Sequence, residues 1–352
     1  MSKTSRSNAT HIRYLRDIVS LLLRRGDLTF DRAAAPCLWQ LAKANQLLLP
    51  VGRAVVEQFG ESIIPADFLP AYKKREQLSK NTLILMAELL SAFAERDLPI
   101  LTIKTFLPFS FVDSNVDIVA GQPDQSARYV QVLSDLGFQH LFNLADLREP
   151  CKKMYGRPSW RAANEPFPKV HLHRALSWNG VDYLDLSAAA AHAQKWRHGG
   201  VEIPIPAAED ELLIMAAHAF FENKFITLHE LFYLTFITPQ ITDWPGVTAK
   251  AAHYFWEPAF SQFIAAAAVL AESVGLSLSL PSSVRAVPNL QVRLPYLLPL
   301  PQTFAYSWQK MWQGVKAGHW RGLPRQLFTY SLVDGAWMYR KAWRKQRGVQ
   351  AC

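Results

Sequence analysis

The chain has 352 residues, of which 50% are hydrophobic and 19% are charged, a composition that excludes the disordered class and predicts a folded globular protein. Its net charge of +9 lies in residues 293–352, where ten Lys and Arg residues stand against one acid, Asp334. Three widely spaced cysteines without a CxxC motif exclude a disulfide-rich secreted scaffold. The N-terminal apolar run lacks the features of a signal peptide, and we expect a cytoplasmic protein.

The first 97 residues are predicted to be helical. Apolar residues at helical spacing in residues 10–58 indicate two helices, separated by a turn at Gly26 and Asp27. Residues 71–96 carry an apolar face beside exposed charges and indicate one longer helix. This part is expected to form an N-terminal helical region, residues 1–97.

Short β-branched runs then predict a sheet. Leu98–Thr105 and Val116–Ala120 have the composition of strands, as do Gln139–Phe142 and Lys169–Leu176. Between them, residues 123–137 have helical periodicity and end at a glycine. The predicted fold class is therefore α+β, with a small mixed β-sheet in residues 98–206 between helical regions.

The remainder of the chain is predicted to be helical again. Acidic residues at 209–211 suit a helix N-terminus, Thr227 and Glu230 form a capping-box pattern, and residues 260–274 indicate one more helix. We divide this part into a helical region, residues 207–292, and a basic, tryptophan-rich C-terminal appendage, residues 293–352. No run is apolar enough for a membrane span.

Acidic and amide side chains alternate near the start of the second predicted strand. Asp113, Asn115 and Asp117 would project from one face, since side chains two apart on a strand share a face. Carboxylate oxygens of this kind can bind Mg²⁺, and such a site suits phosphoryl or nucleotidyl transfer. Simple turn capping by Asp113 and Asn115 is the alternative interpretation.

Two histidines also alternate on one predicted strand. His171 and His173 could bind a transition metal, although the sequence places no third ligand beside them. His218 and Glu222, one helical turn apart, are more typical of a helix surface than of catalysis.

Several of these segments together resemble the uncharacterised nucleotidyltransferase-like family of the polymerase-β-type nucleotidyltransferase superfamily. The resemblance covers roughly residues 15–240. The residues that carry it are Lys104-Thr105, Asn115-Val116-Asp117, His171-Leu172-His173-Arg174, Trp178-Asn179-Gly180 and Asp185.

The resemblance implies a nucleotidyltransferase-like core that binds an NTP and Mg²⁺ and transfers a nucleotidyl group to an acceptor. Lys104 would contact phosphate, with Thr105 and Asn115 at the nucleotide. Asp117 would hold the metal, with Asp113 or Asn115 completing its shell. His173 would orient the attacking group.

Three departures from the family pattern suggest a second hypothesis. Thr105 replaces a glycine that lets the backbone approach the triphosphate, Asn115 replaces the first metal carboxylate, and the third carboxylate is absent. These changes are consistent with a catalytically inactive binding or scaffold protein, held at the inner membrane face by its C-terminal appendage.

The appendage mixes its cations with five tryptophans and four tyrosines. This composition suits an anionic membrane surface, a nucleic acid or other anionic polymer, or an acidic carbohydrate or nucleotide. Alternatively, the aromatic side chains pack the appendage onto the body while the charges are solvated.

Overall fold

The computed structural model describes residues 3–24, 35–104, 115–140, 159–162, 167–178, 181–284, 290 and 292–316. It begins with four helices, α1 (Lys3–Leu22), α2 (Ala35–Ala44), α3 (Leu48–Phe59) and α4 (Leu69–Ala94). The predicted long helix at 71–96 is thus confirmed as α4. Residues 35–59 form two helices where one was predicted, because Gln46 adopts a left-handed conformation with φ 64° between them. The predicted turn at Gly26 and Asp27 lies outside the described residues.

A five-stranded mixed sheet follows, which confirms the α+β class. Its strands are β1 (Ile100–Ile103), β2 (Asn115–Ala120), β3 (Phe138–His140), β4 (Ser159–Ala162) and β5 (Lys169–His173), in the order β1-β2-β5-β4-β3. Strands β2 and β5 are parallel, and the other pairs are antiparallel. Helix α5 (Ser126–Asp135) covers one face together with α4, where Phe93 contacts Tyr129 and the Tyr129 hydroxyl donates to the Pro99 carbonyl.

Two hairpins lead out of the sheet. The first joins β6 (Leu176–Trp178) to β7 (Val181–Leu184), and after α7 (Leu186–Ala191) the second joins β8 (Gln194–His198) to β9 (Val201–Ile205). Its two-residue turn, Gly199 and Gly200, has positive φ at both positions, as a primed turn requires. The predicted strand 169–176 is therefore divided between β5 and the start of β6.

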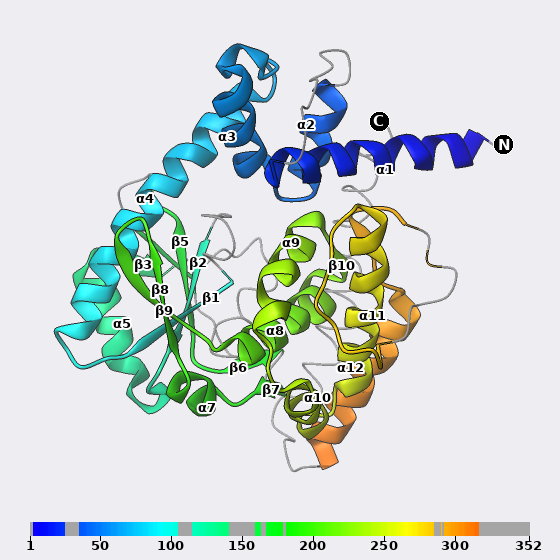
Figure 1. Ribbon diagram of the computed structural model, residues 1–352. Coiled ribbons are helices and arrows are strands. Elements are labelled where there is room, and N and C mark those ends of the chain that lie inside the picture. Colours follow the sequence, from blue (N-terminus) through cyan, green and yellow to red (C-terminus); the bar gives the residue numbers. More distant parts are fainter. Residues whose placement is uncertain are drawn as a thin grey trace.

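The second half of the described chain is mainly helical and lies beside the sheet (Figure 1). Its elements are α8 (Ala208–Ala217), a π-helix (His218–Asn223), β10 (Phe225–Ile226), α9 (Leu228–Ile237), α10 (Trp244–His253) and α11 (Glu257–Ser273). The predicted capping box is confirmed, since Thr227 and Glu230 bond reciprocally at the start of α9.

The start of the predicted C-terminal appendage packs into this helical half. Strand β11 (Tyr296–Leu297) pairs with β10, and α12 (Leu300–Lys316) follows it. His11 of α1 hydrogen-bonds the backbone of Leu294. The Lys310 ammonium, fully buried, donates to the carbonyls of Asp182 and Tyr254. Residues 294–316 thus pack against the body, and the predicted division of the chain at residue 293 stays a prediction.

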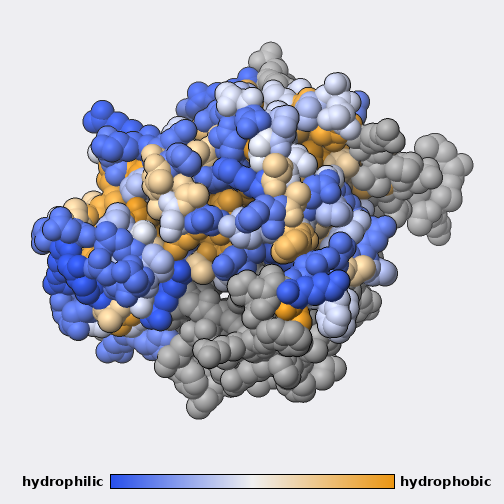
Figure 2. Space-filling view, turned by 90° about the horizontal axis from the view of Figure 1, so that it is seen from below, coloured by the Kyte–Doolittle hydropathy of each residue, from blue (hydrophilic) through white to orange (hydrophobic). Residues whose placement is uncertain are grey.

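One continuous hydrophobic cluster connects the N-terminal helices, the sheet and the helical half. Within the described residues, no helix has the length and apolarity that crossing a bilayer would require. Seen from below, the described surface is a mosaic of hydrophilic and apolar side chains (Figure 2), as is usual where a protein surface meets water.

Asn45 joins distant parts of this core and gives a test of it. Its amide Nδ2 donates to the Leu41 carbonyl, and its Oδ1 accepts from the backbone N–H of Leu228, at the start of α9. We expect Asn45→Ala to lower the free energy of unfolding by about 2 kcal/mol, because a buried helix N-terminal donor loses its partner. Urea unfolding measures this difference.

Gln131→Ala is the matched control, since its hydrogen bond to Asp135 is exposed. It should change the free energy of unfolding by less than about 0.5 kcal/mol. Equal effects of the two substitutions would contradict the structural role of Asn45.

Candidate functional site

Strand pairing brings Asp117, His171 and His173 together. Asp117 of β2 lies opposite His171 of β5, and His173 follows two residues later on the same strand face. Asp117 Oδ1 lies 3.2 Å from His171 Nδ1 and 2.7 Å from His173 Nε2. The three ligand atoms lie within 4.8 Å of one another, so this group could hold a metal ion. Asp117 therefore supplies the third potential ligand atom, which the sequence did not place beside the two histidines.

The second carboxylate oxygen of Asp117 contacts different groups. Asn115 Nδ2 donates to Asp117 Oδ2 at 2.7 Å, and Lys104 Nζ lies 3.8 Å from the same oxygen. The carboxylate is thus oriented, with Oδ2 held by an amide and an ammonium while Oδ1 faces both imidazoles. Hydrogen bonds and charges around a metal-binding side chain fix the orientation of that side chain.

The charge of Asp117 is maintained although its side chain is buried. Burial alone would raise its pKa, but the Lys104 ammonium and hydrogen bonds from His171 and His173 outweigh burial and hold the pKa well below its usual range. Asp117 is therefore an anion at neutral pH, as a metal ligand has to be.

Lys104 is positioned by a residue far away in the sequence. It follows β1 with a left-handed backbone, φ 56°, a conformation that a lysine adopts only when its surroundings hold it there. Its backbone N–H donates to Glu211 Oε1 at 2.9 Å, and the Tyr233 hydroxyl donates to the same oxygen. Helices α8 and α9 thus fix the end of β1 beside Asp117.

Glu211 is almost completely buried, with 2% of its surface exposed. Burial raises its pKa to about 7, although hydrogen bonds from Tyr233 and the Lys104 backbone lower it in part. Burial and the neighbouring Glu211 also raise the pKa of Tyr233 well above its usual value. Glu211 Oε2 has no hydrogen-bond partner among the described residues. The carboxyl group therefore retains its proton to a higher pH than an exposed glutamate does.

The structure brings four of the predicted site residues together: Lys104, Asn115, Asp117 and His173. Asp113 and Thr105 lie outside the described residues, so their predicted roles stay predictions. His173 lies 2.7 Å from Asp117, and its predicted role of orienting the attacking group stays a prediction.

Glu211 and Tyr233 were not expected at this site. The sequence places Glu211 in an acidic first turn of a helix, where the helix dipole already accounts for it. No local pattern links it to Lys104, which precedes it by 107 residues.

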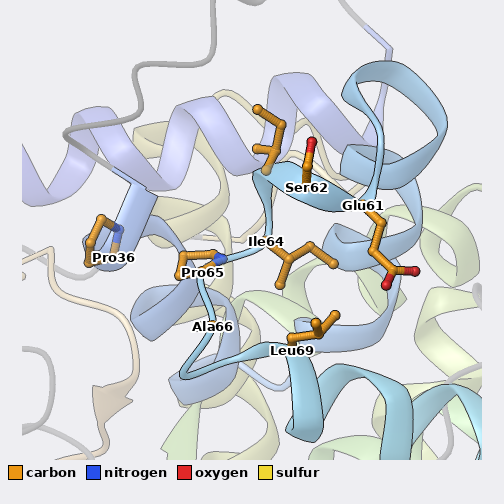
Figure 3. A pocket seen from close by; sticks show the side chains of 8 residues that line it. Pro36, Glu61, Ser62, Ile64, Pro65, Ala66 and Leu69 are labelled. Carbon is orange, nitrogen blue, oxygen red and sulfur yellow. The ribbon is translucent and has the colours of Figure 1, made fainter.

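Other candidate groups lie away from this cluster. His218 and Glu222 form an ion pair of 2.9 Å on the π-helix, consistent with the predicted helix-surface pair. A cavity of about 590 Å³ opens beside α2 and the start of α4 (Figure 3), lined by Pro36, Glu61, Ser62, Ile63, Ile64, Pro65, Ala66 and Leu69. It shares no residue with the Asp117 cluster, and Glu61 is its one ionisable lining residue.

The raised pKa of Glu211 predicts a pH-dependent stability. Between the ordinary glutamate pKa of 4.5 and the raised pKa of about 7, the unfolded chain has lost this proton while the folded protein retains it, so the free energy of unfolding falls as the pH rises. Glu211→Gln keeps an acceptor for the Lys104 N–H but removes the titration. In the wild type, we expect the free energy of unfolding to decrease by about 3 kcal/mol across this pH range. This decrease should be absent in the variant, and urea unfolding measures it.

Glu209→Gln is the control, because Glu209 lies in the same helical turn but hydrogen-bonds Thr242 at the surface. It should keep the pH dependence of the wild type. If Glu211→Gln keeps it as well, Glu211 does not titrate in this range.

Comparison with known proteins does not assign the chain to a family. No protein-family model matches the sequence, and neither a curated protein nor a solved structure matches it. The resemblance to nucleotidyltransferases stays a prediction, and the function has to be inferred from the chemistry of the Asp117 cluster.

Proposed function

We propose that this protein binds a nucleoside triphosphate through one divalent transition-metal ion, held by Asp117, His171 and His173, and transfers its nucleotidyl group to an acceptor. The observation that carries the proposal is that the two oxygens of the Asp117 carboxylate contact different groups. One oxygen faces two imidazole nitrogens, and the other is held by Lys104 and Asn115.

The donor set favours a transition metal over the Mg²⁺ that the sequence predicted. Imidazole nitrogens suit Zn²⁺, Fe²⁺, Co²⁺ and Ni²⁺, whereas Mg²⁺ prefers carboxylates and water. Two histidines and one carboxylate form a known ligand set that leaves positions open for substrate. Atoms bound to one ion at about 2.1 Å lie about 3.0–3.4 Å apart, close to the 3.2 Å and 2.7 Å contacts of Asp117 Oδ1.

The charge of the loaded site would attract a polyphosphate. A divalent ion on one carboxylate and two neutral imidazoles leaves a net positive charge, and Lys104 adds another. The ion would supply Lewis-acid stabilisation at a phosphoryl oxygen. Lys104 would then bind a phosphate oxygen while Glu211 keeps its backbone in place.

The inactive alternative also has an observation in its favour. Asp117 is the one carboxylate in the ligand cluster of the described residues, and the Asn115 amide donates to it where a second acid was expected. Two-metal chemistry needs carboxylates that clamp both ions. In this alternative, the protein would use its single ion to bind a nucleotide and would not transfer the nucleotidyl group.

Metal binding is tested on untagged, full-length protein after treatment with a chelator. We expect Co²⁺ and Zn²⁺ to bind in a one-to-one ratio, about 100-fold more tightly than Mg²⁺. Calorimetry and the visible absorption of Co²⁺ give the affinity and the ligand geometry. His171→Ala and His173→Ala should each weaken binding by about 100-fold, since each removes a ligand.

His192→Ala is the matched control, because His192 is an exposed histidine outside the cluster. It should bind Co²⁺ like the wild type. Equal binding by all three histidine variants would place the ion elsewhere and contradict the proposed site.

Nucleotide binding is tested by the thermal stability of the metal-loaded protein. An NTP at about 100 times its Kd should raise the Tm by about 3–5 °C, and this increase should require the metal. Lys104→Gln should lose most of it while still binding Co²⁺. The control is Lys195→Gln, which removes a lysine exposed on β8.

Radiolabelled NTP then separates the two candidate functions. Release of pyrophosphate in a cell extract, dependent on Asp117, would support transfer. A metal-dependent Tm increase without turnover would favour the binding protein, and no increase with any NTP would contradict both.

A further inference from the structure

Helix α12 is held on the body by a buried lysine. The helix lies beside α11 and also packs against β7 and the π-helix (Figure 1). Lys310 is fully buried in this interface, and its Nζ donates to the carbonyl oxygen of Asp182 at 2.6 Å and to that of Tyr254 at 2.8 Å. These two bonds connect the middle of α12 to β7 and to the residue that follows α10.

Two hydroxyl groups on the same side of α12 do not contribute to this connection. Thr303 and Ser307 are fully buried, but their hydroxyls donate to the carbonyls of Pro299 and Thr303, one helical turn earlier in the same segment. Among the side chains that the structure describes, Lys310 therefore makes the buried hydrogen bonds between α12 and the body.

The surroundings of Lys310 suit an uncharged amine better than an ammonium. A neutral amine has two N–H groups, and the two carbonyls accept one each, whereas an ammonium has a third N–H. Among the described residues, this third N–H finds no acceptor, and no carboxylate forms an ion pair with Lys310. A buried charge without a paired counter-ion strongly destabilises the arrangement that buries it.

The titratable groups around Lys310 do not outweigh its burial. Burial lowers the pKa of Lys310 to about 7, and the negative charge of Asp182 on β7 offsets this effect in part. The Tyr254 ring lies 6.0 Å from Nζ and stays neutral, since burial and nearby aspartates raise its pKa. In the described structure, the other titratable groups on the surrounding helices form no hydrogen bond or ion pair with Lys310; they are His218, Glu222, His253, Glu257 and Glu272.

We propose that Lys310 makes α12 a pH-sensitive latch, docked on the body while the amine is uncharged and loosened when the amine takes up a proton. With α12 undocked, Lys310 lies in water and has its ordinary pKa of 10.5, whereas its pKa is about 7 with α12 docked. Between these values the undocked state holds a proton that the docked state lacks. Docking therefore weakens as the pH falls from 10.5 to about 7 and does not change further below that. This inference does not depend on the proposed function of the Asp117 cluster.

Hydrogen exchange of the full-length protein, followed by mass spectrometry, tests the latch. The exchange rates are corrected for the intrinsic pH dependence of amide exchange. We then expect the α12 amides to be protected about 20-fold less at pH 6.5 than at pH 8.5, since the docking equilibrium changes about tenfold per pH unit above pH 7 and levels off below it. The titration of Glu211 has the opposite sign and lies below about pH 7, so it does not produce this change.

Lys310→Met removes the titratable group and keeps a long apolar side chain, so the protection of α12 should be the same at both pH values. Lys316→Met is the matched control, because Lys316 is an exposed lysine on the same helix, and it should keep the pH dependence of the wild type. Lysine-selective ¹³C NMR measures the titration directly. The Cε resonance of the wild type that is missing from Lys310→Met should titrate with a midpoint near pH 7.

Three results would overturn the proposal. The first is a wild type in which the protection of α12 is equal at both pH values or higher at pH 6.5. The second is a Lys310→Met variant that keeps the wild-type pH dependence. The third is a Lys310 resonance that titrates near pH 10.5, as an exposed lysine does. None of these measurements involves a metal or a nucleotide, so their outcome is independent of the proposed function.

Discussion

The hydrogen bond from the Lys104 backbone to Glu211 is the constraint on which the site depends. It joins the end of β1 to the first turn of α8, and so connects the sheet to the helical half. Both partners of this hydrogen bond adopt an unfavourable arrangement. The Lys104 backbone is left-handed, and the Glu211 carboxyl is buried with its pKa raised to about 7. A buried acid destabilises a fold unless hydrogen bonds compensate its burial, and here the Lys104 N–H and the Tyr233 hydroxyl donate to Glu211 Oε1. The hydrogen bond to Glu211 thus determines where Lys104 lies, with its ammonium 3.8 Å from Asp117 Oδ2.

Asp117 has more hydrogen-bond partners than a buried carboxylate needs. A structural carboxylate needs donors to both oxygens, and an amide, an ammonium and one imidazole would suffice. Here two imidazole nitrogens converge on Oδ1, at 3.2 and 2.7 Å. Both side chains come from one face of β5, and the buried aliphatic residues Val170 and Leu172 alternate with them on the other face. Convergence of several ligand-type atoms in a low-dielectric site is a typical feature of a metal centre.

The sequence predicts those parts of this structure that depend on local periodicity. Helix α4, strands β2 and β5 and the capping box of α9 follow from spacing alone, and the alternation of His171 and His173 correctly places them on one face. The contact of these residues with Asp117 depends on which strands are neighbours, and short strands do not encode their pairing. Glu211 and Tyr233 lie on helices whose sequence patterns are already explained by burial and by the helix dipole. Their role beside Lys104 therefore cannot be predicted from the local sequence. The division of the 169–176 strand reflects the β6–β7 hairpin, which competes with extension of β5.

Histidines in place of carboxylates change both the charge of a metal site and the ion that it prefers. Carboxylates bring negative charge, which holds two hard cations but repels the triphosphate once an ion is lost. Imidazoles are neutral, so a single ion suffices to make the site positive, and the preferred ion moves from Mg²⁺ to a softer metal. Asn115 completes this change, since its amide holds Asp117 without adding charge. Under the proposed function, Asn115 and the two histidines would therefore weaken a two-metal mechanism and favour a site for a single ion.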